Sequence, residues 1–367
     1  MPSAFINTIA TAVPDFDVHE KFIQYCPRLL DDKRSARLFQ RMVERAQIQH
    51  RYSFLEPHRD EDKMDTQGFY RPEAFPDTAA RMHFYEQHAF PLAQRALDQL
   101  DLGQITHLIV TTCTGFFAPG LDQKIIDHYG LSAHVECTTI GFMGCFAAFN
   151  ALKLARHIVR SEENAKVLVV NIELCTLHLK PTGTLEEMLS FLIFADGCAA
   201  SIVSSTPDGL ELQDFKSVVM PETQGLITWR IGGLGFDMHL SGQVPTAIAA
   251  NLPVQLHHLL NGYTRSDITH WAIHPGGRSV LDAVKTGGQL EEQQLSRSRD
   301  ILRRFGNMSS ATIMFVLQDI LDNAGQPGLG FAMGFGRQCR TSSDRYAMRS
   351  DWRKCFPVAQ AGRPPCC

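Results

Sequence analysis

The stretch "ITHLIVTTCTG" (residues 105–115) partly recurs later in the chain as "ITHWAIHPGG" (residues 268–277). Each begins with Ile-Thr-His and continues as a short apolar run ending in a glycine-containing turn, which is typical of a buried strand. The first stretch begins 40 residues before Cys145, and the second begins 39 residues before Asn307. The matched spacing indicates that one structural unit is used twice.

The two repeats continue in the same order. At each downstream point a glycine precedes the polar residue, and an apolar helical pattern follows it. A further apolar run completes each unit; the helical and strand segments are 146–159 and 165–173 in the first unit, and 308–321 and 328–336 in the second. Strand, loop, helix and strand form the unit of a parallel sheet. We therefore predict an α/β fold of two pseudo-symmetric lobes.

Length and composition fit a globular protein of this kind. The chain has 367 residues, of which 44% are hydrophobic and 20% charged, with a formal net charge of −4. This length suffices for one large two-lobed domain, and the charge gives no support for a nucleic-acid partner. We place the lobe boundary near residues 205–215, so that residues 1–205 form the first lobe and residues 206–336 the second.

The apolar runs and the cysteines point to a reduced protein without a membrane segment. No apolar run approaches about 18 residues, and the first residues lack a basic flank before an apolar core, so we expect no membrane span and no signal peptide. The ten cysteines form no CxxC pair, and with the histidines they show no metal-ligand spacing. We therefore expect a cytoplasmic protein without a bound metal.

Cys145 stands at the start of the first apolar helix, an unusual place for a merely structural cysteine. A helix N-terminus carries unpaired N–H groups and partial positive charge, which stabilise a thiolate and lower its pKa. Gly144 permits a tight turn before the cysteine, and Ala147 and Ala148 leave its approach open. This arrangement predicts an activated nucleophile.

Two further polar residues occupy related places in the second repeat. His274 ends its strand, and the following "PGG" forces a loop. Asn307 opens the second helix as Cys145 opens the first. Considered alone, the histidine would be interpreted as a structural side chain and the asparagine as a helix cap. Because the carboxyl ends of parallel strands line the crevice of such folds, we predict that the three residues converge.

Several motifs, in this order, resemble the chalcone-synthase-like type III polyketide synthases, a branch of the thiolase-fold condensing enzymes. They are "GCFAA" around Cys145, "WAIHPGGRSVLD" around His274 and "GNMSSATIMFVL" around Asn307. The segments "LSFLIFADGCAASIVSS" and "CTGFFAPGLD" match a pocket strand and a substrate-tunnel loop of that family. The likeness covers residues 1–336 and implies a thiolase-like αβαβα layered fold.

The resemblance implies an acyltransferase that joins acyl-CoA and malonyl-CoA. An acyl starter would load on Cys145, and decarboxylative Claisen condensations with malonyl-CoA would give a pyrone, resorcinol or related polyketide. His274, as an imidazolium, would pair with the thiolate, and with Asn307 it would donate to the enolate oxyanion. The family requires no metal or redox cofactor.

The resemblance also implies a set of pocket residues. Phe194 would separate the CoA tunnel from the acyl cavity and exclude water. Cys113 lies in the tunnel loop, and Cys175 and His178 lie in the segment "IELCTLHLK" that lines the pocket. Met238 stands where the plant enzymes carry a phenylalanine, which favours an aliphatic over an aromatic starter.

Residues 33–48 form an amphipathic pattern with a stripe of arginines. Arg37, Arg41 and Arg45 recur every fourth residue on one face. Such a stripe is ordinarily a solvated surface, but guanidinium groups also suit the phosphates of CoA. The family places basic residues of this helix at the tunnel mouth; Arg41 and Arg45 match best, and Arg37 matches only by its face.

Other readings of the same residues remain open. A single-round 3-ketoacyl-CoA synthase would accept one malonyl unit and stop, whereas a cysteine hydrolase would cleave its substrate without decarboxylation. An inactive relative with a damaged C-terminus is the third alternative. The resemblance implies a homodimer, and we expect the apolar segment 165–179 at its interface.

The resemblance ends at Gly336. Residues 337–367 carry six arginines, one lysine and four of the ten cysteines, Cys339, Cys355, Cys366 and Cys367. The family continues here with an apolar strand that closes the sheet, but this segment shows no period-2 alternation. We predict a divergent, disordered tail, a second lobe without its final strand, low stability and weak or absent activity.

Overall fold

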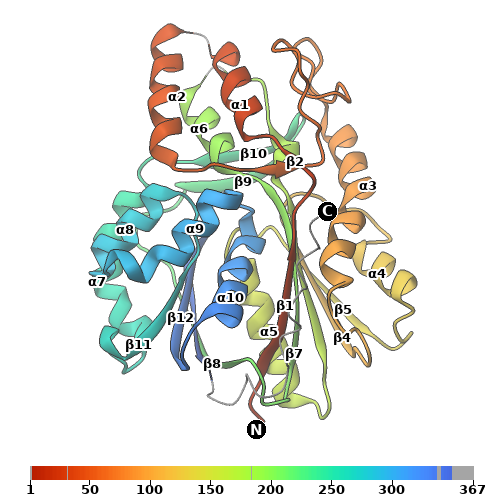
Figure 1. The fold of residues 1–367 in the computed structure, drawn as a ribbon, viewed down its shortest axis with the longest axis vertical. Helices are drawn as coiled ribbons and strands as arrows, with labels where there is room; N and C mark the ends of the chain where they lie inside the picture. Colours follow the sequence, from red (N-terminus) through yellow and green to blue (C-terminus); the bar gives the residue numbers. More distant parts are fainter. Residues whose placement is uncertain (1, 31, 183, 337–339, 349–367) are drawn as a thin grey trace, which may run out of the picture.

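The computed structural model describes residues 2–30, 32–182, 184–336 and 340–348. Within them a nine-stranded mixed sheet runs through the molecule (Figure 1). Its strands in spatial order are β11 (Ile268–Ile273), β12 (Gly328–Gly336), β13 (Arg340–Met348), β8 (Leu210–Val218), β1 (Phe5–Ala12), β7 (Asp196–Ser204), β6 (Val167–Leu174), β4 (His107–Thr112) and β5 (Glu136–Gly141). The small antiparallel pairs are β2 (Phe16–Asp17) with β3 (Tyr52–Ser53), and β9 (Ile227–Gly232) with β10 (Gly235–Leu240).

The helices surround and divide this sheet. They are α1 (His19–Tyr25), α2 (Lys33–Ala46), α3 (Thr78–Leu97), α4 (Leu121–Tyr129), α5 (Ala147–Ser161), α6 (Leu185–Ile193), α7 (Val244–Leu260), α8 (Arg278–Gly288), α9 (Ser296–Phe305) and α10 (Thr312–Asn323). In Figure 1, α1, α2 and α6 gather at one end of the molecule, above the strands. None of the described helices is long and apolar enough to cross a membrane.

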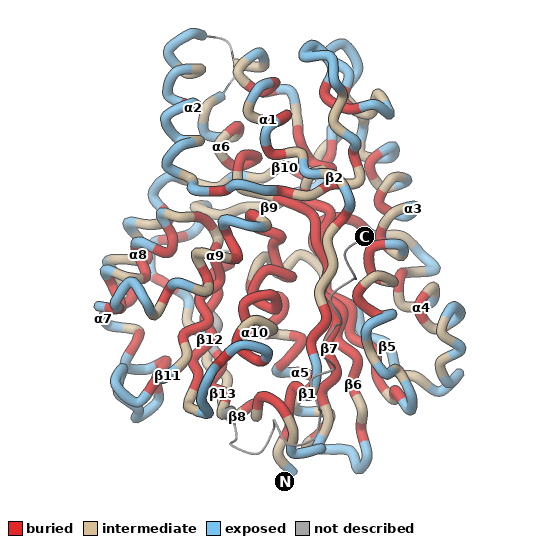
Figure 2. The backbone as a smooth tube through the Cα atoms, viewed as in Figure 1, coloured by how far each residue is buried: buried red, intermediate tan, exposed pale blue. Residues whose placement is uncertain are grey.

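Neighbouring side chains on the strands face different cores, which defines the layers. In β6, Val169 faces a central core built on α5 and α10, whereas Leu168 faces a core shared with α3. In β12, Ala332 faces the central core and Phe331 packs with α7 and α8. Helices α5 and α10 therefore lie between the strands of the two halves, as the αβαβα prediction requires; Figure 2 shows these central elements largely buried.

The strand order repeats across the sheet. The first half reads β5-β4-β6-β7-β1 and the second reads β11-β12-β13-β8, so that β4, β6, β7 and β1 correspond to β11, β12, β13 and β8. Strand β4 is parallel to β6 as β11 is to β12, and the next strand is antiparallel in both halves. The duplication predicted from residues 105–115 and 268–277 is confirmed.

The final strand of the second half is present, so the prediction that it is missing is wrong. Strand β13 pairs antiparallel with β12 and with β8, in the place that β7 takes in the first half. Thr341, Asp344 and Tyr346 are all buried, and the strand has partners on both edges. A strand covered on both faces needs no period-2 alternation, and its ladder uses only backbone groups. The disorder predicted for residues 337–367 is thus wrong for residues 340–348, and its remaining parts, residues 337–339 and 349–367, lie outside the described residues.

The interface expected on residues 165–179 is also wrong. Strand β6 is buried along its whole length and pairs with β4 on one side and β7 on the other. It therefore has no surface to offer a second copy. Strand β5 forms the edge of the sheet, and its first four residues are exposed.

Candidate active site

Cys145 lies in a tight turn between β5 and α5. Gly144 adopts a φ of +78°, a left-handed conformation that favours glycine, and its N–H donates to Sγ of Cys113 at 3.2 Å. Phe146 is the N-cap of α5, so Cys145 precedes the helix by two residues. The thiol thus lies near the helix N-terminus, at the carboxyl end of a strand of the first half.

His274 follows β11 at the equivalent edge of the second half. Its backbone N–H donates to the carbonyl oxygen of Met333 in β12 at 2.8 Å, which fixes the start of the loop. The side chain is 1% exposed, and neither ring nitrogen has a hydrogen-bond partner among the described residues. Burial lowers the pKa of His274 to about 3. A neutral imidazole with both nitrogens available therefore faces the cavity that Cys145 also lines.

Asn307 links the helix α9 to the turn that carries Phe194. Its N–H donates to the Ile193 carbonyl at 2.7 Å, and its carbonyl accepts from the Ala195 N–H at 3.0 Å. The side-chain Oδ1 accepts from the Ser309 N–H at 2.9 Å. The Nδ2 group donates to the carbonyl of Gly276, in the loop after His274, at 3.2 Å.

Burial determines the charge state of Cys145. The pKa of the thiol is raised to about 12, chiefly by burial and to a lesser extent by Glu173, whereas hydrogen bonds from Ser309 and Asn307 oppose the shift. Desolvation therefore acts against the lowering of this pKa that was predicted from the helix N-terminus. Thiol and imidazole are both neutral, and charge can develop only if the thiol proton passes to an acceptor such as His274.

One cavity is lined by the three residues predicted to converge and by four of the five predicted pocket residues. The first set is Cys145, His274 and Asn307, and the second is Cys113, Cys175, Phe194 and Met238. Its wall is otherwise mostly apolar, and sequence reasoning missed Ile227, Trp229, Leu240, Val244 and Phe335. The β9–β10 hairpin supplies several of these. Its sequence carries no distinct motif, so only the fold brings it to the cavity.

His178, the fifth predicted pocket residue, lies behind the wall. Its Nε2 lies 2.7 Å from the carbonyl of Thr114, and its Nδ1 accepts from the Phe236 N–H at 3.0 Å. The ring stacks on Phe236 at 4.4 Å and meets Trp229 edge-on at 5.3 Å. Burial lowers the pKa of His178 to about 3. This histidine supports the lining and does not face the cavity.

Glu173 is a buried carboxyl group beside the cavity that sequence reasoning also missed. Its oxygens accept from the Cys113 N–H at 2.9 Å, the Thr114 hydroxyl at 3.0 Å and the Ser310 hydroxyl at 2.6 Å. Burial raises the pKa of Glu173 to about 7, and these hydrogen bonds oppose the shift. In the sequence, Glu173 is the single acidic residue within the apolar run of β6, and this pattern could have indicated a buried carboxyl group.

A second cavity lies behind Phe194. It shares Cys175, Phe191 and Phe194 with the first cavity, so these residues form a common wall. The buried Arg51 holds this wall, because its Nη1 donates to the carbonyls of Phe191 and Phe194 at 2.8 Å each. Burial lowers the pKa of Arg51 only to about 10, so the guanidinium stays charged at neutral pH.

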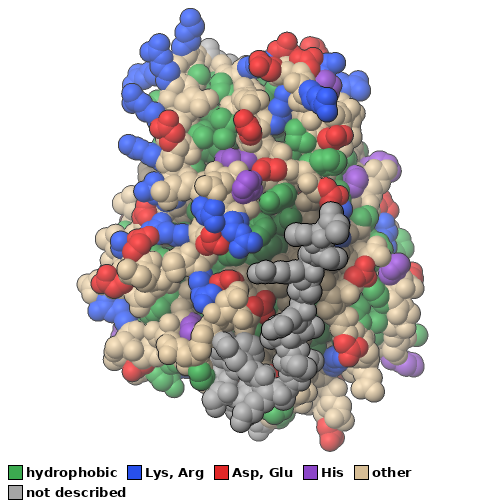
Figure 3. Space-filling model, viewed as in Figure 1, with side chains coloured by type: hydrophobic (Ala, Val, Ile, Leu, Met, Phe, Trp, Pro, Cys, Tyr) green, Lys and Arg blue, Asp and Glu red, His purple; other side chains and the backbone are tan. Residues whose placement is uncertain are grey.

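A groove leads from the first cavity to the surface near α2. The two share Leu240, Val244, Gly276 and Val280, and the groove is also lined by Arg45 and Arg278. The Arg278 Nη1 donates to the carbonyl of Arg45 at 3.1 Å. Arg37 and Arg41 are exposed on α2 but do not line the groove. Figure 3 shows Lys and Arg side chains gathered over this end of the molecule.

Comparison with known families matches nearly the whole described chain. Residues 3–207 match the N-terminal domain of chalcone and stilbene synthases, and residues 211–337 match the C-terminal domain. A curated relative, the alpha-pyrone synthesis polyketide synthase-like Pks18 of Mycobacterium tuberculosis, is 34% identical over 276 residues, which is 70% of each chain.

Solved structures agree with this match. PKS-I from the brown alga Ectocarpus siliculosus has 27% sequence identity and a TM-score of 0.86, over 95% of this chain and 99% of that one. CsyB in complex with CoA-SH, at 20% identity, shares the fold with a TM-score of 0.83 over 94% of this chain and 100% of its own. The chain therefore belongs to the chalcone and stilbene synthase family, the type III polyketide synthases, which are acyltransferases.

Proposed function

We propose that this polyketide synthase loads an acyl starter from acyl-CoA on Cys145 and extends it with malonyl-CoA. The observation that carries the proposal is the convergence of Cys145, His274 and Asn307 on one mostly apolar cavity. A hydrolase requires access for water, whereas this lining disfavours water and protects a reactive enolate.

Loading begins with transfer of the thiol proton from Cys145 to His274. The Sγ atom then attacks the thioester carbonyl, and the bond to the CoA sulfur breaks, so CoA leaves as a thiolate that takes up a proton. Because burial disfavours charge on either residue alone, the two charges must form together as an ion pair. The empty hydrogen-bonding capacity of His274 suits this role.

Extension uses the same histidine with Asn307. Malonyl-CoA loses CO2, and the electron pair of the broken C–C bond forms an enolate whose oxygen carries the charge. The second Nδ2 hydrogen of Asn307 and an N–H of His274 can donate to that oxygen. The enolate carbon then attacks the Cys145 thioester, the C–S bond breaks, and the extended ketoacyl chain is released from the cysteine.

We infer an aliphatic starter and a pyrone, resorcinol or related product. The reaction cavity carries the flexible Met238 beside largely apolar neighbours, which favours an acyl chain. The relative Pks18 is named for alpha-pyrone synthesis, which supports a pyrone.

We assign the CoA phosphates to the groove beside α2. Arg45 and Arg278 line it and supply guanidinium donors, and a protein of the same fold is known in complex with CoA-SH. Arg41 and Arg37 follow along the same exposed helix and contribute long-range attraction.

We also propose a homodimer that joins through the β5 edge. Within the described residues β5 pairs with β4 alone, and the exposed residues of β5 leave its outer ladder free. Phe116 and Phe142 stack at 5.3 Å beside this edge and add apolar surface. Native proteins seldom leave such an edge uncovered.

The decisive experiment is incubation with malonyl-CoA and a panel of acyl-CoA starters, followed by mass analysis of products and peptides. We expect an acyl group on Cys145 and products with two or more malonyl-derived units. Cys145→Ala should abolish both, and Cys137→Ser is the matched control because Cys137 is exposed outside the cavity. A single extension would indicate a ketoacyl-CoA synthase, and a free acid without CO2 release would indicate a hydrolase.

A further inference from the structure

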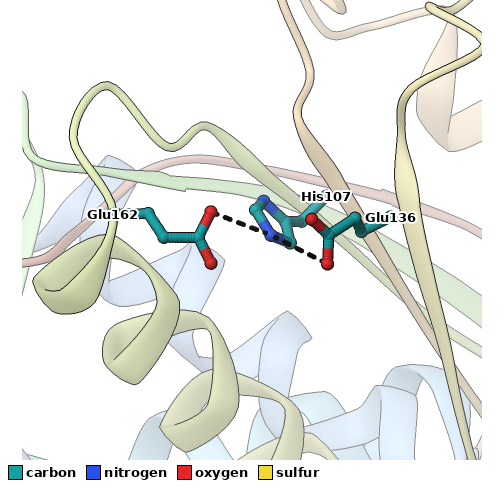
Figure 4. A group of neighbouring side chains, drawn as sticks. All are labelled: His107, Glu136 and Glu162. Atoms are coloured by element: carbon teal, nitrogen blue, oxygen red, sulfur yellow. Dashed lines mark ion pairs between the residues drawn. The ribbon is translucent and has the colours of Figure 1, made fainter.

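Three side chains gather at the end of α5 remote from Cys145. His107 begins β4, Glu136 begins β5, and Glu162 follows the last residue of α5 (Figure 4). One nitrogen of the histidine and one oxygen of each carboxylate all lie within 4.8 Å of one another. Because α5 has 15 residues at about 1.5 Å each, the group lies about 22 Å along the helix from the cysteine end.

The imidazole of His107 is buried and fixed by Thr106. The side chain is 8% exposed, and its Nδ1 lies 2.9 Å from the Thr106 hydroxyl oxygen. That hydroxyl donates to the Lys166 carbonyl at 3.2 Å and accepts from the Lys166 N–H at 3.0 Å. A hydroxyl has a single hydrogen, so while the Thr106 hydroxyl donates to Lys166, Nδ1 is the donor to Thr106, and Nε2 is the ring nitrogen left for a metal ion.

The Nε2 atom faces two carboxylates. The Nε2 atom lies 3.4 Å from Oε2 of Glu162 and 3.8 Å from Oε2 of Glu136. Both distances exceed the usual N–H···O range of about 2.7–3.2 Å. Ligands at about 2.0–2.2 Å from a tetrahedral zinc ion lie about 3.3–3.6 Å apart. The separation from Glu162 falls in this range, and the separation from Glu136 lies slightly above it.

We propose that His107, Glu136 and Glu162 bind a zinc ion, with water as the fourth ligand. Imidazole nitrogen and carboxylate oxygen are ordinary zinc ligands, and a hydrogen bond from the second ring nitrogen is the usual way such a histidine is oriented. The carboxyl end of α5 also favours a cation. The ion joins the starts of two strands to the end of the helix that leads back to Cys145, and its role is structural.

The site shows no local sequence motif, because Glu136 lies 29 residues after His107 and Glu162 lies 26 residues after Glu136. The three ligands also belong to different elements. The absence of metal-ligand spacing noted for the cysteines and histidines concerns local patterns alone. Parallel pairing sets His107 directly opposite Glu136, and the length of α5 brings Glu162 to the same end.

Cobalt(II) is the probe for this site. We expect the chelator-treated full-length protein to bind one Co2+ with tetrahedral d–d absorption, and zinc to displace it. The spectrum of His107→Gln subtracted from that of the wild type isolates this site from any cysteine-bound metal, and that difference must lack sulfur-to-metal charge-transfer bands. Glu136→Gln and Glu162→Gln should weaken binding by roughly tenfold or more, and Thr106→Ala by roughly 10–100-fold.

Glu163→Gln is the matched control, because Glu163 is the exposed neighbour of Glu162 and does not belong to the group. It should bind Co2+ as the wild type does, and zinc should raise the unfolding temperature of both. Glu162→Gln changes a half-exposed side chain and so keeps the test valid if the buried histidine variant fails to fold. A zero difference spectrum, thiolate bands within it, or equal binding by Glu162→Gln and Glu163→Gln would overturn the proposal.

Discussion

At the scale of single residues, the proposed reaction depends on transfer of a proton from Cys145 to His274. Burial raises the pKa of the thiol to about 12 and lowers that of the imidazole to about 3. Either charge alone is therefore unfavourable in this cavity, whereas an adjacent pair compensates itself. Glu173, whose pKa burial raises to about 7, adds negative charge nearby only when it ionises.

Replacing His274 tests this coupling directly. In His274→Gln we expect iodoacetamide to alkylate Cys145 roughly 100-fold more slowly at pH 7, because no base accepts the proton. The midpoint of the rate against pH should move upward toward about 12, the value that burial sets for the lone thiol. His157→Gln, an exposed histidine of α5, is the control. An unchanged profile in His274→Gln would disprove the assignment.

Asn307 should matter for decarboxylation more than for loading. We expect Asn307→Ala to leave acylation of Cys145 largely intact and to slow CO2 release roughly 10²–10³-fold, the effect of losing one oxyanion donor. Asn307→Asp keeps an acceptor for the Ser309 N–H and so separates the lost donor from a disturbed turn. Single-turnover acylation and labelled CO2 release measure the two steps; a loss of loading with intact decarboxylation would reverse the roles.

At the scale of elements, the proposed binding of CoA in the groove beside α2 depends on which arginines line the groove. Arg45→Ala should raise the KM for malonyl-CoA roughly two- to tenfold with little change in kcat, because Arg45 lines the groove. Arg37→Ala is the matched control, since Arg37 is exposed on the same helix outside the groove. Steady-state kinetics decides, and equal effects of the two substitutions would remove the specific role of Arg45.

Strand β13 buries polar side chains in the sheet between β12 and β8. This burial gives a new physical reason for the predicted low stability. Asp344 is 1% exposed, its Oδ1 has no partner among the described residues, and burial raises its pKa well above the ordinary value. The folded state then binds more protons than the unfolded state, so stability falls as pH rises above the aspartate value of about 3.9.

Asp344→Asn should therefore stabilise the protein by about 1–3 kcal/mol at pH 8 and by less at pH 5. Urea unfolding at the two pH values measures the change. Asp127→Asn, an exposed substitution on α4, should have little effect at either pH. The prediction is contradicted if the wild type becomes more stable between pH 5 and pH 8 and Asp344→Asn abolishes that increase.

At the scale of the whole molecule, sequence reasoning reached what local pattern and duplication encode. The repeat around residues 105–115 and 268–277 gave the two pseudo-symmetric lobes, and the family resemblance gave the layers. The repeat also led to Cys145 and Asn307, which stand where the two helices begin, and to His274, which follows a strand. Arg278 was missed because only tertiary packing brings it to the groove. Glu173 was missed although a single acid in an apolar strand was visible in the sequence, because only the fold brings it beside the cavity. Strand β13 was missed because a strand buried on both faces carries no alternating pattern.

The proposed dimer is the prediction at this scale. Light scattering at micromolar concentration should give twice the chain mass of 41.0 kDa. Thr139→Glu on the exposed part of β5 should shift the equilibrium toward monomer, because a twofold axis brings like charges together. Asp127→Asn again serves as the control. A monomeric wild type, or a Thr139→Glu protein that dimerises equally well, would refute the β5 interface.

The position of β13 has a consequence for how the protein is made. Strand β8 ends at Val218, and the strand that covers its open side begins at Arg340. At about 5–20 residues per second, the ribosome needs roughly 6–25 s to bridge that interval. During this time the nascent chain displays an uncovered strand edge, which is a template for intermolecular pairing. Lower growth temperatures and chaperones that bind unfolded chains are therefore expected to improve the soluble yield of this synthase.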